Sequence, residues 1–206
     1  PVPDFEYLAK RFSTESWAAL NAAMDKTRRT GRPYELELEM VRPDGSPGWM
    51  HARGEAVFDD NGNVRMLQGV ASDITERKQA QARIQLAASV FNHAREGIMV
   101  TDANGTILDV NDAFVRITGY TREEVLGRSP NILKSGRHPA EFYTAMWNDL
   151  AVDGYWAGEI WNRRKNGEIY PELLTISSIS GTDGWTTQYV ALFTDISRLK
   201  EHEQQL

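Results

Sequence analysis

Hydrophobic and polar positions between residues 97 and 194 alternate in short runs that are separated by turn residues. Asn104-Gly105 lies between two such runs and predicts a hairpin, because both residues tolerate the positive φ of tight turns. Pro139 begins a longer segment whose apolar residues recur on one side, which predicts a helix. This order predicts an α+β fold in which a five-stranded antiparallel sheet carries helices on one face. The predicted strands are residues 97–102, 106–110, 156–164, 168–178 and 185–194.

The closing part of this pattern occurs twice in the chain. An Arg-Pro-Asp-Gly turn at Arg42 and an Asp-Ile-Thr motif at Asp73 recur as an Arg-Lys-Asn-Gly turn at Arg164 and an Asp-Ile-Ser motif at Asp195. The two copies are 122 residues apart, close to one small domain, which predicts two related domains in tandem. The first copy lacks counterparts of the first two strands, so we expect it to be trimmed at its start. We predict the C-terminal part of a first domain at 1–75, a helical connector at 76–92, a complete second domain at 93–196 and the start of an exit helix at 197–206.

The predicted connector has a helical pattern of apolar residues. Ala80, Ile84, Ala87 and Phe91 recur at spacings of 4, 3 and 4 residues within a charged, Gln-rich stretch. This seam suits a short coiled coil between two chains, and it equally suits an amphipathic helix that packs on its own sheet. Both interpretations remain open from the sequence.

Composition excludes several classes of function. A net charge of −6 offers no basic surface for nucleic acid. The absence of cysteine excludes disulfides, thiolate zinc sites and iron–sulfur clusters, and no apolar stretch is long enough to span a membrane. The four histidines lack metal-ligand spacing, and no nucleophile, base and charge stabiliser occur at a recognisable spacing. We therefore expect a cytoplasmic segment that is not an enzyme and has no metal site, nucleic-acid partner or membrane contact.

Several short motifs in the second copy resemble those of the PAS family of sensory domains, whose members share this order of elements. The resemblance implies the PAS fold and a sensory and dimerisation module that responds to a small ligand or a redox state. It also implies a homodimer with paired connector helices, and a downstream histidine kinase or cyclic-di-GMP enzyme in a full-length protein that is cytoplasmic or membrane-linked. The motifs are Asn111 with Ala113-Phe114, Thr118-Gly119-Tyr120, Glu124-Val125-Leu126-Gly127, Arg164-Lys165-Asn166-Gly167 and Asp195-Ile196-Ser197.

The second copy also resembles redox-sensing flavin PAS domains, such as those of nitrogen-fixation regulators, which implies FAD as a candidate cofactor. Trp147, Trp156 and Asn162 match positions in those domains. The two tryptophans would enclose an apolar pocket, and the amide of Asn162 would both donate to and accept from a flavin edge. Glu172 is a fourth candidate, because it stands where light-sensing relatives carry an asparagine.

Other features argue against particular cofactors. Pro130 stands where light-sensing relatives carry a cysteine, and proline cannot form their covalent bond to flavin. Phe193 replaces a glutamine of those relatives, which reduces the polar contacts to a flavin ring. His138 precedes the long helix from which haem-binding relatives supply a ligand, but its Gly-Arg-His-Pro context is typical of a loop and argues against haem. The cofactor therefore stays unknown, and FAD, another small metabolite and a ligand-free protein-interaction scaffold all remain open.

Each copy ends in an aspartate that is followed two positions later by a hydroxyl residue. Asp73 with Thr75, and Asp195 with Ser197, stand at predicted strand-to-helix junctions. An aspartate at the start of a helix accepts hydrogen bonds from its first amides. We predict that these four residues relay a shift of the last strand to the helix that follows.

Overall fold

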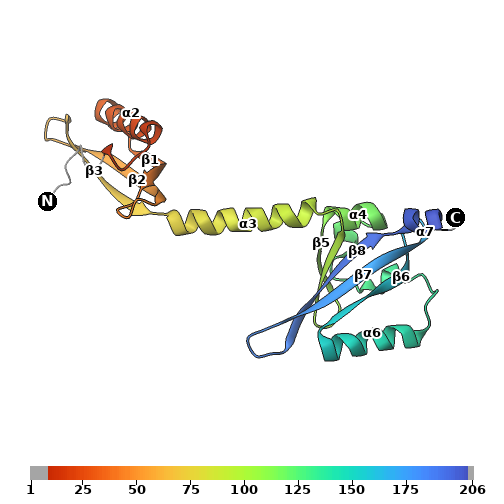
Figure 1. Cartoon of the computed structure of the whole chain (residues 1–206). Coiled ribbons are helices and arrows are strands. Elements are labelled where there is room, and N and C mark those ends of the chain that lie inside the picture. The colour runs from red at the N-terminus through yellow and green to blue at the C-terminus, as the bar shows by residue number, and fades with distance from the viewer. Residues whose placement is uncertain (1–8, 204–206) are drawn as a thin grey trace. The chain divides into compact units, whose positions relative to one another are not determined.

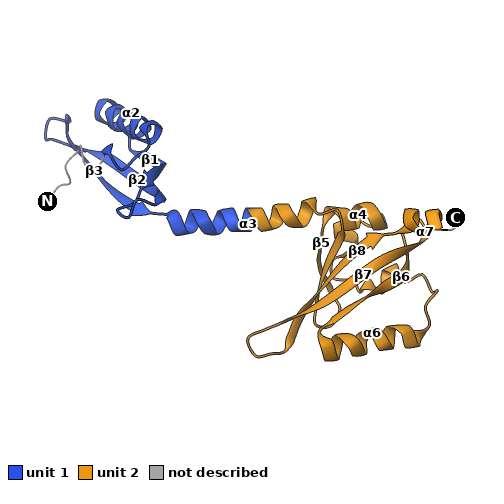
Figure 2. Ribbon diagram, in the orientation of Figure 1, with its two compact units in different colours: residues 1–85 blue, residues 86–206 orange. Residues whose placement is uncertain are grey.

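The computed structural model describes residues 9–203 of the chain. The chain divides into two compact units, residues 1–85 and residues 86–206, which have different colours in Figure 2. Each unit contains a sheet of its own (Figure 1). Residues 1–8 of the first predicted domain and residues 204–206 of the predicted exit helix lie outside the described residues.

Unit 1 is a three-stranded antiparallel sheet with a helix packed against it. The helix α2 begins after Ser13, whose Oγ accepts a hydrogen bond from the amide of Ser16 at 3.1 Å. It ends at Gly31, whose φ of 69° is costly for residues with a Cβ. The first strand alternates exposed glutamates with inward leucines, and Leu38 packs against Leu20 of the helix. The elements are α2 (Thr14–Thr30), β1 (Tyr34–Val41), β2 (Pro47–Phe58) and β3 (Val64–Asp73), with strand order β1-β2-β3.

Unit 2 contains the five-stranded antiparallel sheet that the hydrophobic pattern predicts. The strand order is β5-β4-β8-β7-β6, so the last strand lies at the centre of the sheet between β4 and β7. A shift of this strand would therefore have to be accommodated by two paired neighbours. The strands are β4 (Gly97–Asp102), β5 (Ile107–Val110), β6 (Tyr155–Arg163), β7 (Ile169–Ser180) and β8 (Thr186–Asp195).

Side-chain caps determine where the short helices of unit 2 begin. Asn111 Oδ1 accepts a hydrogen bond from the amide of Phe114 at 2.9 Å and starts the first of them. Thr121 and Glu124 form a reciprocal capping box at the start of the second. The helices are α4 (Asp112–Thr118), α5 (Arg122–Val125), the 3₁₀ turn η1 (Pro130–Leu133), α6 (Ala140–Asp153) and α7 (Ser197–Glu203).

The core of unit 2 lies between its sheet and these helices. Leu174 and Ile176 of β7 pair in register with Phe193 and Ala191 of β8, and residues two apart on a strand share a face. These four side chains are buried in one cluster with residues of the helical segments, which confirms the α+β prediction with helices on one face of the sheet. The helical residues of the cluster are Phe114, Val125, Leu133, Met146 and Leu150.

The helix α3 (Thr75–His93) leads from β3 toward β4 and includes the residues predicted to form the connector. Its first turns are held on unit 1, because Arg77 and Lys78 both form ion pairs with Glu37 of β1. Further along, Ile84 and Val90 expose 70% and 63% of their surface. Within residues 9–203, neither this helix nor any other is long and apolar enough to cross a membrane.

Candidate functional site

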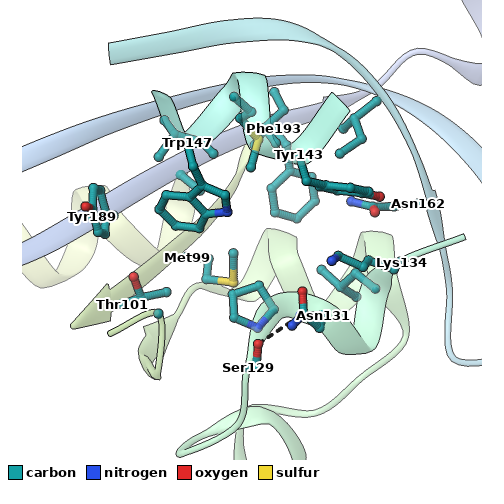
Figure 3. Close-up of a pocket in the computed structure, with 18 of the residues that line it drawn as sticks. Met99, Thr101, Ser129, Asn131, Lys134, Tyr143, Trp147, Asn162, Tyr189 and Phe193 are labelled. Carbon is teal, nitrogen blue, oxygen red and sulfur yellow. Dashed lines mark hydrogen bonds between the residues drawn. The ribbon is translucent and has the colours of Figure 1, made fainter. Parts of the chain in front are cut away.

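Unit 2 encloses a cavity of about 290 Å³ between its sheet and the helical segments. Strands β4, β6, β7 and β8 form one wall, and residues of η1 and α6 form the other. Figure 3 shows Tyr143, Asn162 and Lys134 on one side of the cavity, and Trp147 and Tyr189 on the other. The volume lies near the lower end of the range of about 300–1,000 Å³ that is usual for small-molecule sites. We call this space the cavity.

Trp147 of α6 and Tyr189 of β8 form an aromatic wall. Their ring centroids are 5.4 Å apart in an edge-to-face arrangement. Trp147 lines the cavity, as the sequence predicts for a binding candidate, yet it exposes 45% of its surface. It therefore stands where the cavity meets solvent rather than deep in the core.

Trp156, the second predicted tryptophan, does not line the cavity. Its ring packs edge-to-face against Phe142 of α6, with the centroids 5.9 Å apart. Phe142 in turn stacks on His138, with the centroids 4.1 Å apart. The structure thus brings Trp147, Asn162 and Glu172 together at the cavity and leaves Trp156 in a neighbouring aromatic cluster.

Asn162 and Glu172 form a buried hydrogen-bonded pair at the cavity wall. Asn162 Nδ2 donates to Glu172 Oε1 at 2.8 Å, and the Tyr170 hydroxyl donates to Glu172 Oε2 at 2.7 Å. Asn162 on β6 is the register partner of Tyr170 on β7, so these two side chains lie on the same face of the sheet. Glu172 is 1% exposed and Tyr170 is fully buried. Both carboxylate oxygens are therefore paired inside the protein.

Burial changes the acid–base behaviour of this group. Removal from water raises the pKa of Glu172 from 4.5 to about 7, although the hydrogen bonds from Tyr170 and Asn162 partly oppose that rise. Burial also raises the pKa of Tyr170, so its hydroxyl stays protonated and remains a donor. Near neutral pH, Glu172 is consequently poised between carboxylate and neutral acid.

Tyr143 of α6 is a cavity residue that the sequence reasoning missed. Its hydroxyl is buried and has no hydrogen-bond partner within residues 9–203. The Lys134 ammonium lies 4.1 Å from the centre of its ring. The available signal was helical spacing, because Tyr143 and Trp147 are four residues apart on α6 and share one face. A buried hydroxyl without a partner costs free energy, and a ligand with a matching polar atom would remove that cost.

Other cavity residues show which chemistry the site lacks. Pro130 lines the cavity, and its side chain offers no nucleophile to a ligand. Phe193 also lines it, and its side chain is 2% exposed. Besides Tyr143, Asn162 and Glu172, the lining contains further polar side chains: Thr101, Asn104, Ser129, Asn131, Lys134 and Tyr189.

His138 lies outside the cavity lining, and its ring nitrogen is already engaged. The amide of Trp161 donates to His138 Nε2 at 2.9 Å. Burial lowers the pKa of His138, which keeps the imidazole neutral and able to accept this bond. The histidine therefore joins the loop before α6 to β6. Among residues 9–203, no group of three His, Asp or Glu side chains is arranged to hold a metal ion.

The junction between β8 and α7 is organised by Asp195. Its Oδ1 accepts hydrogen bonds from the amide of Ser197 at 2.9 Å and from the Ser197 hydroxyl at 2.6 Å. Its Oδ2 pairs with Arg164 Nη2 at 2.6 Å. Partial burial opposes the charged form, but these bonds outweigh it and hold the pKa of Asp195 below its usual value. Asp195 therefore stays ionised at neutral pH.

Arg164 links this junction to the buried pair. Its guanidinium lies 3.9 Å from the centre of the Tyr170 ring while it pairs with Asp195. The Arg164 side chain is 15% exposed, so this charge is largely removed from water. Contacts therefore run without interruption from Asn162 at the cavity, through Glu172 and Tyr170, to Arg164 and Asp195.

In unit 1, the junction between β3 and α3 has the same pattern of contacts, but its side chains are more exposed to solvent. The amide of Thr75 donates to Asp73 Oδ1 at 2.8 Å, and Arg42 Nε pairs with Asp73 Oδ2 at 3.2 Å. The Thr75 hydroxyl accepts a hydrogen bond from the amide of Trp49 at 2.9 Å and ties the start of α3 to β2. The Arg42 and Asp73 side chains are 30% and 46% exposed, more than their counterparts Arg164 and Asp195 at 15% and 28%.

A five-stranded antiparallel sheet with a ligand-sized cavity beneath its helices defines a class of small sensory domains. The family profile described as PAS domain matches residues 95–198, and the profile described as PAS fold matches residues 5–71. The chain belongs to the PAS family. PAS domains are sensory modules, and the chain is accordingly a sensory signalling segment.

Curated relatives are regulators and sensors of greater length. A nitrogen fixation regulatory protein of Klebsiella oxytoca is 30% identical over 141 residues, which cover 68% of this chain and 28% of the relative. The sensor protein FixL of Bradyrhizobium diazoefficiens is 21% identical over 212 residues, or 98% of this chain and 42% of the relative. The chain thus spans less than half the length of either relative.

Solved structures agree on the fold. The PAS domain of a protein from Colwellia psychrerythraea superposes with a TM-score of 0.54 at 24% sequence identity. The match covers 56% of this chain and 98% of that domain. At this identity the likeness shows a shared fold.

Proposed function

We propose that unit 2 is a sensor that binds a small planar ligand in the cavity and relays occupancy through the Asp195 junction to α7. The observation that carries the proposal is Tyr143, which lines the cavity and whose buried hydroxyl has no hydrogen-bond partner among the described residues. Trp147 and Tyr189 supply flat aromatic surface on the other side of the cavity, and Asn162 supplies a carboxamide. Together they suit a ring system that carries polar atoms on one edge.

FAD is the specific cofactor that the resemblance to redox-flavin PAS domains favours. The cavity suits a flavin ring, with Trp147 beside its face and Asn162 and Tyr143 at its polar edge. About 290 Å³ is too small for a whole dinucleotide, so the remainder would extend past Trp147 into solvent. When bound, such a group would supply redox sensitivity. The residues of this chain would orient the ring, exclude water and pair its polar edge.

Relay to the exit helix rests on the central position of β8. This strand contributes Ala191 and Phe193 to the cavity wall and ends in Asp195, which caps α7. A ligand that displaces the cavity wall would bias the arrangement of the Asp195–Ser197 junction. We propose the same role for Asp73 and Thr75 at the start of α3. The effector we propose is a histidine kinase or a cyclic-di-GMP enzyme in the longer protein.

We also propose that a second copy of the chain pairs with the connector helix. Ile84 of α3, which belongs to the predicted apolar seam, exposes 70% of its surface, and Ala80 and Ala87 of the same seam are exposed as well. Exposed apolar surface that is contiguous marks interaction sites. Light scattering at graded concentrations should show a dimer that Ile84→Glu shifts toward monomer. Gln85→Glu, which adds the same charge at the neighbouring position, should leave it intact. Equal weakening by both variants would contradict pairing through this seam.

The sensing proposal is tested by the absorption spectrum of the freshly purified chain, with mass spectrometry of whatever denaturation releases. A flavin spectrum would support FAD, and release of a colourless metabolite would support a different ligand in the same cavity. Asn162→Ala should reduce the amount released, while Glu141→Gln on the exposed start of α6 should not. A chain that releases nothing would favour the alternative function, a ligand-free scaffold for dimerisation and protein interaction.

A further inference from the structure

Asn162 and Glu172 form a hydrogen bond whose direction depends on the protonation of Glu172. As a carboxylate, Glu172 can only accept, and it accepts from Asn162 Nδ2 and from the Tyr170 hydroxyl. The carboxamide of Asn162 must then turn its oxygen away from Glu172. Because Asn162 lines the cavity, that oxygen is the group it offers to a ligand.

The neutral acid reverses this requirement. A protonated Glu172 carries one O–H donor, and Asn162 can receive it only through its carboxamide oxygen. A half-turn of the carboxamide meets this need at almost no steric cost, because its oxygen and its NH₂ group are similar in size. The NH₂ group then points away from Glu172, and the cavity wall presents a donor instead of an acceptor. The Tyr170 hydroxyl can keep donating to the second oxygen in both states.

Charged and titratable groups surround Glu172 from several elements. Asp195 on β8 is its register partner and opposes its ionisation, whereas Arg164 between β6 and β7 favours it. Tyr170 on β7 stays protonated because burial raises its pKa. Tyr143 on α6 and Lys134 after η1 are the titratable groups that the helical segments contribute to the cavity lining. Burial outweighs the favourable contacts and raises the pKa of Glu172 to about 7, so neutral pH populates both forms.

We propose that proton uptake by Glu172, through reorientation of the Asn162 carboxamide, switches the cavity wall from a hydrogen-bond acceptor to a hydrogen-bond donor. The inference rests on the proposed ligand-binding function of the cavity and specifies how that site is regulated. The proton comes from bulk water and returns to it. A ligand with an N–H or O–H at this position holds Glu172 as a carboxylate, and a ligand with a carbonyl or ring nitrogen holds it as the neutral acid.

The test is an NMR titration of the ligand-free full chain from pH 5 to pH 9. The carboxyl carbon of Glu172 and the side-chain amide of Asn162 should titrate together, with one midpoint near pH 7. Glu172→Gln removes the group that takes up the proton, so the Asn162 signal should lose its pH dependence. Glu141→Gln should titrate like wild type.

Two outcomes would overturn the proposal: a Glu172 carbon that does not titrate in this range, or a titrating Glu172 with an unchanged Asn162 amide. If Glu172→Gln fails to fold, the wild-type titration alone decides between these results. The measurement needs no ligand, so it separates this inference from the proposed function. Failure to release any small molecule would contradict the sensor and leave the titration intact, whereas a missing titration would leave ligand release unaffected.

Discussion

Glu172 and Asp195 are register partners on the neighbouring strands β7 and β8. One carboxyl group is buried at the cavity wall, and the other caps the helix that leaves the domain. Arg164 pairs with Asp195 and lies on the ring of Tyr170, which donates to Glu172. A continuous set of polar contacts therefore links the cavity wall at Glu172 on β7 to the start of α7, which follows the neighbouring strand β8.

The raised pKa of Glu172 predicts a pH-dependent stability. The folded chain binds a proton more tightly than the unfolded chain, with pKa values of about 7 and 4.5. This contribution is fully present below pH 4.5 and is lost as the pH rises through about 7. The free energy of unfolding of wild type, relative to Glu172→Gln, should fall by roughly 2.5 kcal/mol between pH 5 and pH 8. Urea unfolding of both proteins measures it, and an unchanged difference would contradict a raised pKa.

Asp195→Ala should loosen the exit helix. The substitution removes the acceptor for Ser197 and one of the two carboxylates that pair with the largely buried Arg164, at a cost of about 2 kcal/mol. Hydrogen exchange should accelerate in α7. Asp73→Ala removes the more exposed pair with Arg42 and should cost less, about 1 kcal/mol. Equal losses of stability in the two variants would show that burial does not distinguish the junctions.

Tyr143→Phe should have opposite effects on stability and on ligand binding. Removal of a buried hydroxyl without a partner should stabilise the ligand-free chain by about 1 kcal/mol. The same change should reduce the amount of small molecule that copurifies, because the ligand loses a polar contact. Tyr155→Phe, at a tyrosine that is 51% exposed, should change neither quantity. Thermal unfolding and mass spectrometry measure the two effects, and a destabilised Tyr143→Phe would contradict an unpaired hydroxyl.

Gly97→Ala should disturb the cavity from the sheet side. A Cβ at Gly97 would lie 2.3 Å from the Phe193 ring, which is buried and lines the cavity. The ring would have to move, at a cost of about 1–3 kcal/mol. Gly181→Ala in the β7–β8 turn, where the nearest atom is a side-chain oxygen of the exposed Asp183 at 3.0 Å, should stay within about 0.5 kcal/mol of wild type. Similar melting temperatures for both variants would contradict the close approach.

Features that depend on neighbouring residues could be predicted from the order of the amino acids. Alternation predicted the five strands, the Thr121–Glu124 pair predicted a capping box, and the repeated motifs predicted two related PAS regions. The strands and the capping box involve hydrogen bonds or periodicities within a few residues, so local composition decides them, whereas the repeat is visible because its two copies share motifs. The fold class follows because the order of such elements leaves few ways to bury their apolar faces.

Which side chains meet at the cavity depends on tertiary packing. The fold places Trp147 at the cavity and Trp156 against Phe142, although the sequence offers both tryptophans equally. It buries the Tyr143 hydroxyl without a hydrogen-bond partner in the described part of the chain. It also brings together Arg164 and Asp195, 31 residues apart in the chain. These relationships depend on strand register and on how α6 packs against the sheet. The same packing buries Glu172, and burial moves the pKa of its carboxyl group toward neutrality.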